Sequence, residues 1–264
     1  MTINSHQILH FISHFFQAKR KGHGVHSPFV YKLCEEVIYN QNSYYDFIEL
    51  ERLRAALLNN EQEIEITDLG AGSKTFKTKL RKIKSIAAKG ISSSRQSQIF
   101  YKLINVLGLR YSIELGTSLG LNTMYLAKAC KKGQVLSLEG SANLIHVAKQ
   151  LVYRHEVNNI HFIEGNFDDT FSKALELNPA LDFLYIDGNH SYEATLRYFE
   201  SALSYKNKHS VFVFDDIYWS KGMSKAWEMI KKNPQVTLSV DCFYFGMIFF
   251  RPEILEKQDL KLYL

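Results

Sequence analysis

The 264-residue sequence predicts an α/β fold with a doubly wound, mostly parallel sheet, preceded by a helical extension. From residue 95 onward, short apolar segments alternate with segments of helical periodicity, as expected where helices connect buried parallel strands. Residues 236–240 and 243–250 are both strand-like and leave no room for a helix between them. One of these two strands must therefore run antiparallel to the rest of the sheet.

The first part of the chain has helical periodicity. The predicted helices cover residues 5–20, 29–39 and 44–58. Ser27 and Pro28 begin the second helix as its N-cap and its first-turn proline. The glycine-flanked loop at residues 22–26 contains two histidines and could close over a substrate.

Three histidines of the first helix, His6, His10 and His14, share one helix face because they are spaced by four residues. Such a face could bind a metal ion, but no cysteine or acidic residue lies nearby in the sequence. We therefore interpret it as the half-exposed face of a helix.

From residue 95 the sequence predicts seven strands, at residues 111–115, 134–138, 160–163, 181–186, 210–214, 236–240 and 243–250. The predicted helices cover residues 97–107, 122–131, 142–155, 171–177, 192–205 and 223–231. We thus expect two parts, a helical extension with a lid-like loop at residues 1–94 and an α/β domain at residues 95–264.

Composition narrows the classes of protein. Hydrophobic residues make up 46% and charged residues 22%, which is typical of a globular chain. The three cysteines lie far apart without a Cys-x-x-Cys pair, so neither a zinc knuckle nor a disulfide framework is predicted. No signal peptide and no membrane span is predicted, and we expect a cytoplasmic location. A homodimer is left open.

The net charge of +5 is concentrated in residues 74–89, which contain seven basic residues and no acidic one. This segment could bind phosphate, nucleic acid or an acidic partner. A solvated helix face or loop explains it equally simply, and we favour that interpretation.

Two glycine turns compete as the cofactor site. Residues 67–73 read Thr-Asp-Leu-Gly-Ala-Gly-Ser, but no acidic residue follows between residues 86 and 98, where one would hold ribose hydroxyls. The turn from Gly116 to Gly120 follows the strand at residues 111–115, and Glu139 lies nineteen residues beyond Gly120. That offset suits a carboxylate that binds ribose. We therefore place the cofactor at Gly116–Gly120 and interpret residues 67–73 as a loop, which could act as a lid.

Acidic residues gather where the predicted strands end, an edge at which open α/β sheets bind ligands. They are Glu114, Glu139, Asp187, Asp215 and Asp216. Like charges repel, so hydroxyl or ammonium groups of a ligand, or a divalent cation, are needed to balance them.

The segments Glu114-Leu-Gly-Thr-Ser-Leu-Gly120, Leu138-Glu139, Glu164-Gly-Asn-Phe167, Tyr185-Ile-Asp-Gly-Asn-His-Ser-Tyr192 and Phe214-Asp-Asp216 together resemble a class I S-adenosylmethionine-dependent methyltransferase. That family has a Rossmann-like seven-stranded sheet with one antiparallel strand. Within it, the chain is similar to Mg²⁺-dependent small-molecule O-methyltransferases of the catechol, caffeoyl-CoA and macrocin types. The resemblance covers residues 95–264.

The resemblance implies S-adenosylmethionine as cofactor, with contacts from Glu114, Gly116, Ser118, Gly120, Glu139, Asn166 and Asp187. Asn166 would touch the adenine, although a turn residue is an equal explanation. It also implies Mg²⁺ held by Asp187, Asp215 and Asp216, and carboxylate oxygens are ligands that Mg²⁺ prefers. Helix capping by one of the adjacent acids and an Asp-Gly turn at Asp187 are the alternatives.

Asp187 and His190 are the predicted catalytic residues, with His190 as general base for a hydroxyl proton. The chain departs from the macrocin-type pattern at Asn189, where an acid is usual, so the identity of the base stays open. Trp219 could line the substrate pocket, whereas Trp227 has the spacing of a core residue. The predicted function is O-methylation of a small hydroxylated molecule. The alternatives are RNA methylation through residues 74–89 and a non-catalytic cofactor-binding protein.

Overall fold

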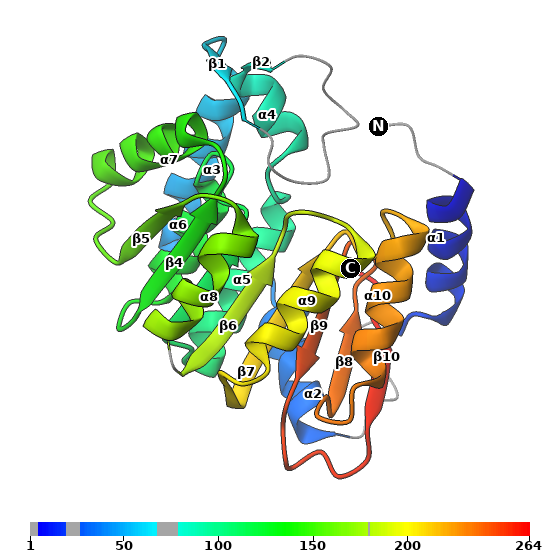
Figure 1. Ribbon diagram of the computed structural model, residues 1–264. Helices are drawn as coiled ribbons and strands as arrows, with labels where there is room; N and C mark the ends of the chain where they lie inside the picture. Colours follow the sequence, from blue (N-terminus) through cyan, green and yellow to red (C-terminus); the bar gives the residue numbers. More distant parts are fainter. Residues whose placement is uncertain (1–4, 20–26, 68–78, 179) are drawn as a thin grey trace. The chain divides into compact units, whose positions relative to one another are not determined.

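The computed structural model describes residues 5–19, 27–67, 79–178 and 180–264 (Figure 1). The chain divides into two compact units. The central unit is Gln41–Asn178, and the terminal unit combines Met1–Asn40 with Pro179–Leu264. This division reflects spatial compactness, and the domain boundary between residues 94 and 95 stays a prediction.

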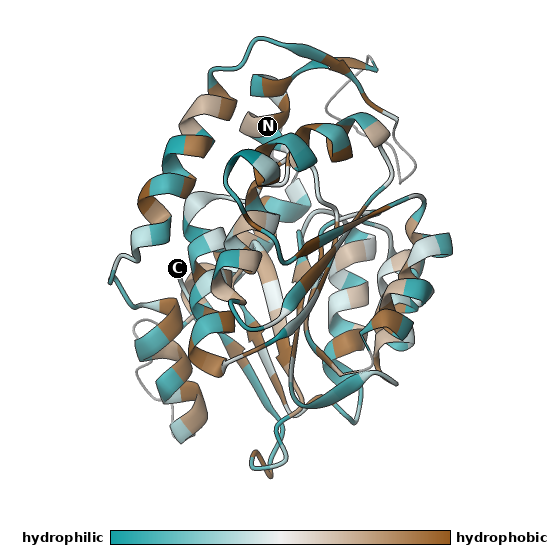
Figure 2. Cartoon of the chain, turned by 90° about the vertical axis from the view of Figure 1, so that its left-hand side faces the viewer, coloured by the Kyte–Doolittle hydropathy of each residue, from teal (hydrophilic) through white to brown (hydrophobic). Residues whose placement is uncertain are grey.

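The central unit contains three parallel strands, β3 (Tyr111–Leu115), β4 (Gln134–Glu139) and β5 (Ile160–Glu164), with β4 between the other two. Its helices are α3 (Tyr45–Leu58), α4 (Ile83–Lys89), α5 (Ser94–Leu107), α6 (Leu121–Ala129), α7 (Ala142–Arg154) and α8 (Phe167–Leu177). Strands β1 (Glu63–Glu65) and β2 (Leu80–Lys82) form a separate antiparallel pair. Figure 2 shows hydrophilic and hydrophobic bands alternating along the helices, the pattern of helices that cover a core with one face.

The terminal unit has five strands in the order β10-β8-β9-β7-β6. They are β6 (Leu181–Ile186), β7 (Lys206–Asp215), β8 (Leu238–Asp241), β9 (Phe245–Phe249) and β10 (Gln258–Lys261). The helical segments of this unit are α1 (Ser5–Gln17), α2 (Pro28–Leu33), the π-helical turn η1 (Cys34–Ile38), α9 (Tyr192–Ala202) and α10 (Lys221–Lys232). Of these five described strands, only β9 runs antiparallel to its neighbours, β7 and β8, as the closing hairpin predicted.

The described residues thus contain a mostly parallel sheet of eight strands, one more than predicted. The additional strand, β10, pairs in parallel with β8. Three of its four residues are polar and only Leu260 is buried, so it lacks the apolar pattern by which the other strands were predicted. The doubly wound α/β class is confirmed, and the strand count of seven is wrong.

Buried aromatic side chains fill the core of the terminal unit. Trp227 of α10 lies over Gly246 of β9, where an added Cβ atom would come within 2.6 Å of the indole ring. The glycine therefore makes room for the tryptophan, which is buried as predicted. All five residues of β9 are buried, as expected for a strand covered on both faces.

Acidic side chains of α3 accept hydrogen bonds that fix this helix within the central unit. Asp46 accepts a hydrogen bond of 2.6 Å from the Tyr101 hydroxyl, and Glu49 accepts one of 2.7 Å from Lys128.

Among the helices described, none combines the length and apolar character needed to cross a lipid bilayer.

Candidate functional site

The turn between β3 and α6 has an unusual backbone. Gly116 and Gly120 have φ angles of 108° and 81°, and Ser118 between them has a φ of 49°. The N–H groups of Gly116 and Thr117 both donate to the Leu138 carbonyl oxygen, at 2.9 and 3.2 Å. The turn is therefore bonded to the end of β4 and held in a conformation that favours glycine.

Gly120 also lies against α7. A Cβ atom at this position would come 2.7 Å from the Ala148 Cβ atom, closer than packed side chains approach. Gly120 is the N-cap residue of α6 and provides no capping side chain. The missing Cβ atom of Gly120 therefore lets α7 pack closely against the turn, and the turn leads into the N-terminus of α6, where backbone N–H groups can bind a ligand.

Glu139 at the end of β4 is bonded directly to this turn. One carboxylate oxygen accepts a 2.9 Å hydrogen bond from the Ser118 N–H, and the other accepts a 3.0 Å bond from the Ser141 N–H. The carboxylate is half-buried and fixed in direction by these two bonds. Glu139 and Ser118 are thus together, and the bond of Glu139 to ribose stays a prediction.

Glu114 lies beneath the turn rather than at its surface. Its side chain is fully buried and accepts hydrogen bonds from Asn122 (2.8 Å), Thr123 (2.5 Å) and Ser137 (2.7 Å). Burial raises the pKa of Glu114 to about 7, and these three hydrogen bonds oppose the rise. The structure places this carboxylate as an internal support of β3, β4 and α6, and its contact with the cofactor stays a prediction.

Asn166 is the N-cap residue of α8. Its side-chain oxygen accepts a 3.0 Å hydrogen bond from the Asp168 N–H. Asn166 therefore acts as a turn residue, one of the two alternatives that the sequence left open. The hydrogen bond uses the oxygen of the side-chain amide. The predicted contact with adenine stays a prediction.

In the terminal unit, one tyrosine connects two of the predicted metal ligands. The Tyr185 hydroxyl on β6 lies 2.8 Å from an Asp215 carboxylate oxygen and 3.1 Å from one of Asp187. A hydroxyl has a single proton to donate, so it can serve only one of the two carboxylates at a time. Tyr185 is not among the predicted site residues, although a tyrosine two residues before Asp187 lies on the same face of an extended chain.

Asp216 and His190 complete the acidic group. Asp216 has a φ of 52°, and burial raises its pKa to about 6. His190 Nε2 lies 3.5 Å from an Asp187 carboxylate oxygen. Burial lowers the pKa of His190, and the charge of Asp215 opposes this shift.

The three predicted ligands suit Mg²⁺ in chemical type, since all three provide carboxylate oxygens. Among the described residues, however, no group of three or more histidine, cysteine, aspartate or glutamate side chains could hold a metal ion. The structure connects Asp187 with Asp215 through Tyr185 but does not assemble all three acids into a preformed site.

Both the glycine turn and the segments with the acidic residues contain strained backbone. Among the described residues, five non-glycine residues have positive φ, and three of these are Ser118, Asn189 and Asp216. Such conformations cost free energy and tend to persist where function needs them. This agreement is independent of the sequence motifs, because φ angles of non-glycine residues cannot be read from the sequence.

The histidine face of α1 agrees with its prediction in part, and all three histidines have partners on other elements. His6 Nε2 lies 2.9 Å from the Ser224 hydroxyl, His10 stacks on Tyr218 at 4.5 Å, and His14 is buried beside Asp241. The prediction of a half-exposed face agrees with His6 and His10, which are half-buried, and is wrong for His14, which is buried. Nothing in the helix sequence alone could indicate it, since these partners come from residues more than 200 positions away.

Several features predicted for the N-terminal part of the chain lie in loops and in the basic segment. Three predicted features lie wholly or partly outside the described residues. They are the loop at residues 22–26, the glycine turn at residues 67–73 except Thr67, and residues 74–78 of the basic segment. Within the described part of that segment, Lys82 and Lys84 both form ion pairs with Glu61. This pairing agrees with the interpretation as a solvated surface.

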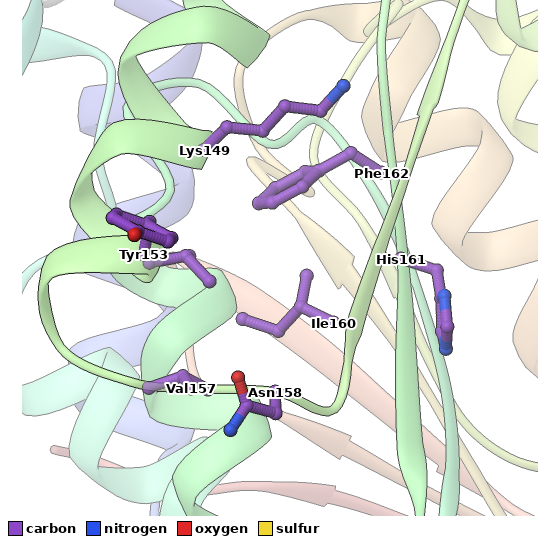
Figure 3. A pocket seen from close by; sticks show the side chains of 8 residues that line it. Lys149, Tyr153, Val157, Asn158, Ile160, His161 and Phe162 are labelled. Carbon is purple, nitrogen blue, oxygen red and sulfur yellow. The ribbon is translucent and has the colours of Figure 1, made fainter.

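A hollow of about 420 Å³ lies between α7 and β5. Figure 3 shows Tyr153 of α7 and Ile160 and Phe162 of β5 facing it, with Lys149 extending over the Phe162 ring. None of the predicted site residues lines this hollow. It is therefore separate from the glycine turn.

A family model described as "Methyltransferase domain" matches residues 113–217, a range that includes every predicted site residue. No curated protein matches the chain. Among solved structures, the O-methyltransferase from Bacillus cereus in complex with SAH has a TM-score of 0.55 at 19% identity, covering 79% of this chain and 92% of that chain.

Two further structures have the same fold. The SAH-bound methyltransferase PaMTH1 from Podospora anserina has a TM-score of 0.55 at 13% identity, covering 80% of this chain and 99% of that one. The O-methyltransferase TomG from Streptomyces achromogenes, in complex with SAM, has a TM-score of 0.52 at 19% identity, covering 61% and 82%. At these identities the likeness shows the fold alone, and the family model matches residues 113–217.

Proposed function

We propose that this chain, a class I S-adenosylmethionine-dependent methyltransferase by domain and fold, is an O-methyltransferase that acts on a small hydroxylated molecule with the help of Mg²⁺. The observation that carries the proposal is the position of the domain match. It includes both the strained glycine turn and the acidic residues that end β6 and β7.

The glycine turn supports S-adenosylmethionine as the methyl donor. The turn from Gly116 to Gly120 ends at the N-terminus of α6, where the methionine end of the cofactor would bind. Glu139, held by the N–H groups of Ser118 and Ser141, is the acceptor for the ribose hydroxyls. SAH and SAM occupy the solved structures with this fold that are named above, which agrees with this assignment.

The acidic residues support a hydroxylated substrate. Asp187, Asp215 and Asp216 would hold Mg²⁺, which, when bound, lowers the pKa of a substrate hydroxyl and neutralises the carboxylates. His190 Nε2, next to Asp187, would accept the hydroxyl proton. The substrate oxygen then forms a bond to the methyl carbon while the carbon–sulfur bond breaks, and the sulfonium leaves as a neutral thioether.

The test measures S-adenosylhomocysteine release by mass spectrometry from the protein incubated with S-adenosylmethionine, Mg²⁺ and a panel of catechols, phenols and sugars. We expect release with at least one hydroxylated compound, loss of release on adding EDTA, and recovery with excess Mg²⁺. Asp215→Asn should lower the rate by about tenfold or more, because a charged ligand of the metal is lost.

Asp182→Asn is the matched control, since Asp182 lies at the opposite end of β6 and accepts a hydrogen bond from Asn207. Release that EDTA leaves unchanged would remove the metal from the proposal. Binding of S-adenosylmethionine without turnover of any compound would favour the non-catalytic alternative.

A further inference from the structure

Helix α1 is amphipathic in the reverse sense to most surface helices. Its polar face points inward, where His6 bonds to Ser224 of α10, and His14 is buried beside Asp241. Figure 1 shows α1 alongside α10 in the terminal unit. Because residues four apart share one helix face, the side chains opposite these histidines point away from the unit.

The outward face is apolar and exposed. Six large hydrophobic side chains of α1 are exposed: Ile8, Leu9, Phe11, Ile12, Phe15 and Phe16. Leu9 is 67% exposed and Phe16 is 80% exposed. In an ordinary surface helix such residues would face the core, so this face is made to contact something other than water.

This apolar surface continues beyond the helix. The Phe15 ring lies 5.6 Å from the Tyr263 ring, and Phe11 contacts Phe243, which in turn contacts the exposed Tyr244. Large aromatic side chains have roughly 150–250 Å² of surface each, so the exposed patch is on the order of several hundred Å². Monomeric proteins rarely expose a contiguous patch of that size unless it is functional.

The charges around the patch are basic. Residues 1–34 contain no aspartate or glutamate. Lys19 follows the helix, and Lys261 donates a 2.8 Å hydrogen bond to the neutral side chain of Gln17 at the end of α1. Of the acids on neighbouring elements, Asp241 is buried with His14, while Glu228 and Asp259 both form ion pairs with Lys231.

These charges distinguish between two occupants. In a symmetric dimer through α1, the same basic residues of both copies would meet, and like charges oppose association. An anionic lipid surface instead complements both the basic rim and the apolar face. We propose that α1 docks this protein on anionic bilayers, lying in the plane of the interface with its phenylalanine and leucine side chains inserted.

The length of the helix agrees with this orientation. With 13 residues, α1 is about 20 Å long, which is too short to cross a hydrocarbon core of about 30 Å. Insertion of one face needs no such length. This docking is independent of methyl transfer, so it stands or falls separately from the proposed function.

The test is co-sedimentation of the full chain with vesicles of phosphatidylcholine alone, and of phosphatidylcholine and phosphatidylglycerol in equal parts. We expect binding to the anionic vesicles that weakens as salt is raised. The double variant Leu9→Gln/Phe16→Gln should bind at least about tenfold more weakly, because two inserted apolar side chains are lost.

The matched control is Leu177→Gln/Leu255→Gln, which changes two exposed leucines elsewhere in the chain and should bind normally. Both double variants replace exposed side chains, so their thermal unfolding should match the parent protein. Absence of binding to anionic vesicles, or binding that Leu9→Gln/Phe16→Gln leaves unchanged, overturns the proposal. A dimer in analytical ultracentrifugation that this variant dissociates, without vesicle binding, assigns the face to a second copy and also overturns it.

Discussion

The glycine turn of the central unit and the acidic strand ends of the terminal unit both contain carboxylates, but they balance them differently. At the turn, Glu139 has a backbone N–H donor for each oxygen, and Glu114 has three side-chain donors. At the strand ends, Asp187 and Asp215 share the single hydroxyl proton of Tyr185.

This difference indicates how each region meets its ligand. The turn is organised before any ligand binds, because its carboxylates and strained backbone are fixed by internal hydrogen bonds. Asp187, Asp215 and Asp216, by contrast, do not form a group that could hold a metal ion among the described residues. A cation bound there, as proposed, would neutralise these carboxylates.

Gly120→Val, in the glycine turn, should have the largest effect on stability of the three substitutions. The valine Cβ atom would meet Ala148 at 2.7 Å in a backbone conformation, φ of 81°, that L-residues rarely adopt. We expect the free energy of unfolding to fall by about 3 kcal/mol or more. Urea denaturation measures this loss.

The matched control is Gly108→Ala, since Gly108 also has a positive φ, of 66°, but nothing within 4 Å of an added Cβ atom. Its cost should be limited to backbone strain of about 1 kcal/mol. Equal losses for the two variants would show that contact with α7 contributes nothing at Gly120.

Glu114→Gln tests whether the buried Glu114 carboxyl group makes the stability of the fold depend on pH. The folded protein keeps the Glu114 proton up to about pH 7, whereas the unfolded chain releases it near 4.5. The group therefore stabilises the fold fully below pH 4.5, and this contribution, about 3 kcal/mol, is lost as the pH rises to about 7. The variant should lack this slope.

Denaturation of both proteins between pH 4.5 and pH 8 checks the prediction. Relative to Glu114→Gln, the parent protein should lose stability as the pH rises across this window. A constant difference between the two proteins would mean that Glu114 is ionised throughout.

Tyr185→Phe should have the smallest effect on stability of the three substitutions. Removing the shared hydroxyl leaves Asp187 and Asp215 without this donor, and we expect a loss of about 1–2 kcal/mol in the absence of metal. Mg²⁺ should then raise the melting temperature of the variant. Tyr198→Phe, which alters a 3.3 Å contact with Asn189, is the control. No response of either tyrosine variant to Mg²⁺ would count against a cation at these acids.

Much of the α/β fold could be predicted because its strands are apolar and bounded by clear turns. The ranges of β3 and β6 agree with their predictions at both ends. Strand β10 could not be found, since one buried leucine among polar residues has no periodicity. It forms because the edge of β8 offers backbone partners, which is a property of the assembled sheet.

Strand ends, spacing and the family resemblance together predict the site residues, but not the internal partners of these residues. Ser137, which bonds to Glu114, is a lone polar residue within an apolar strand, and this signal was available in the sequence. The contacts of His14 with Asp241 join residues 227 positions apart. Such contacts depend on how helices settle on the sheet, which helical periodicity alone does not specify.

Isothermal titration calorimetry can show whether the turn at Gly116–Gly120, together with Glu139, binds S-adenosylmethionine. Glu164 occupies the position on β5 that pairs with Glu139 of β4, so Glu164→Ala is the control for Glu139→Ala. We predict that the parent protein and Glu164→Ala bind S-adenosylmethionine alike, and that Glu139→Ala binds at least about tenfold more weakly. Undiminished binding by Glu139→Ala, or no binding by the parent protein, would contradict the account.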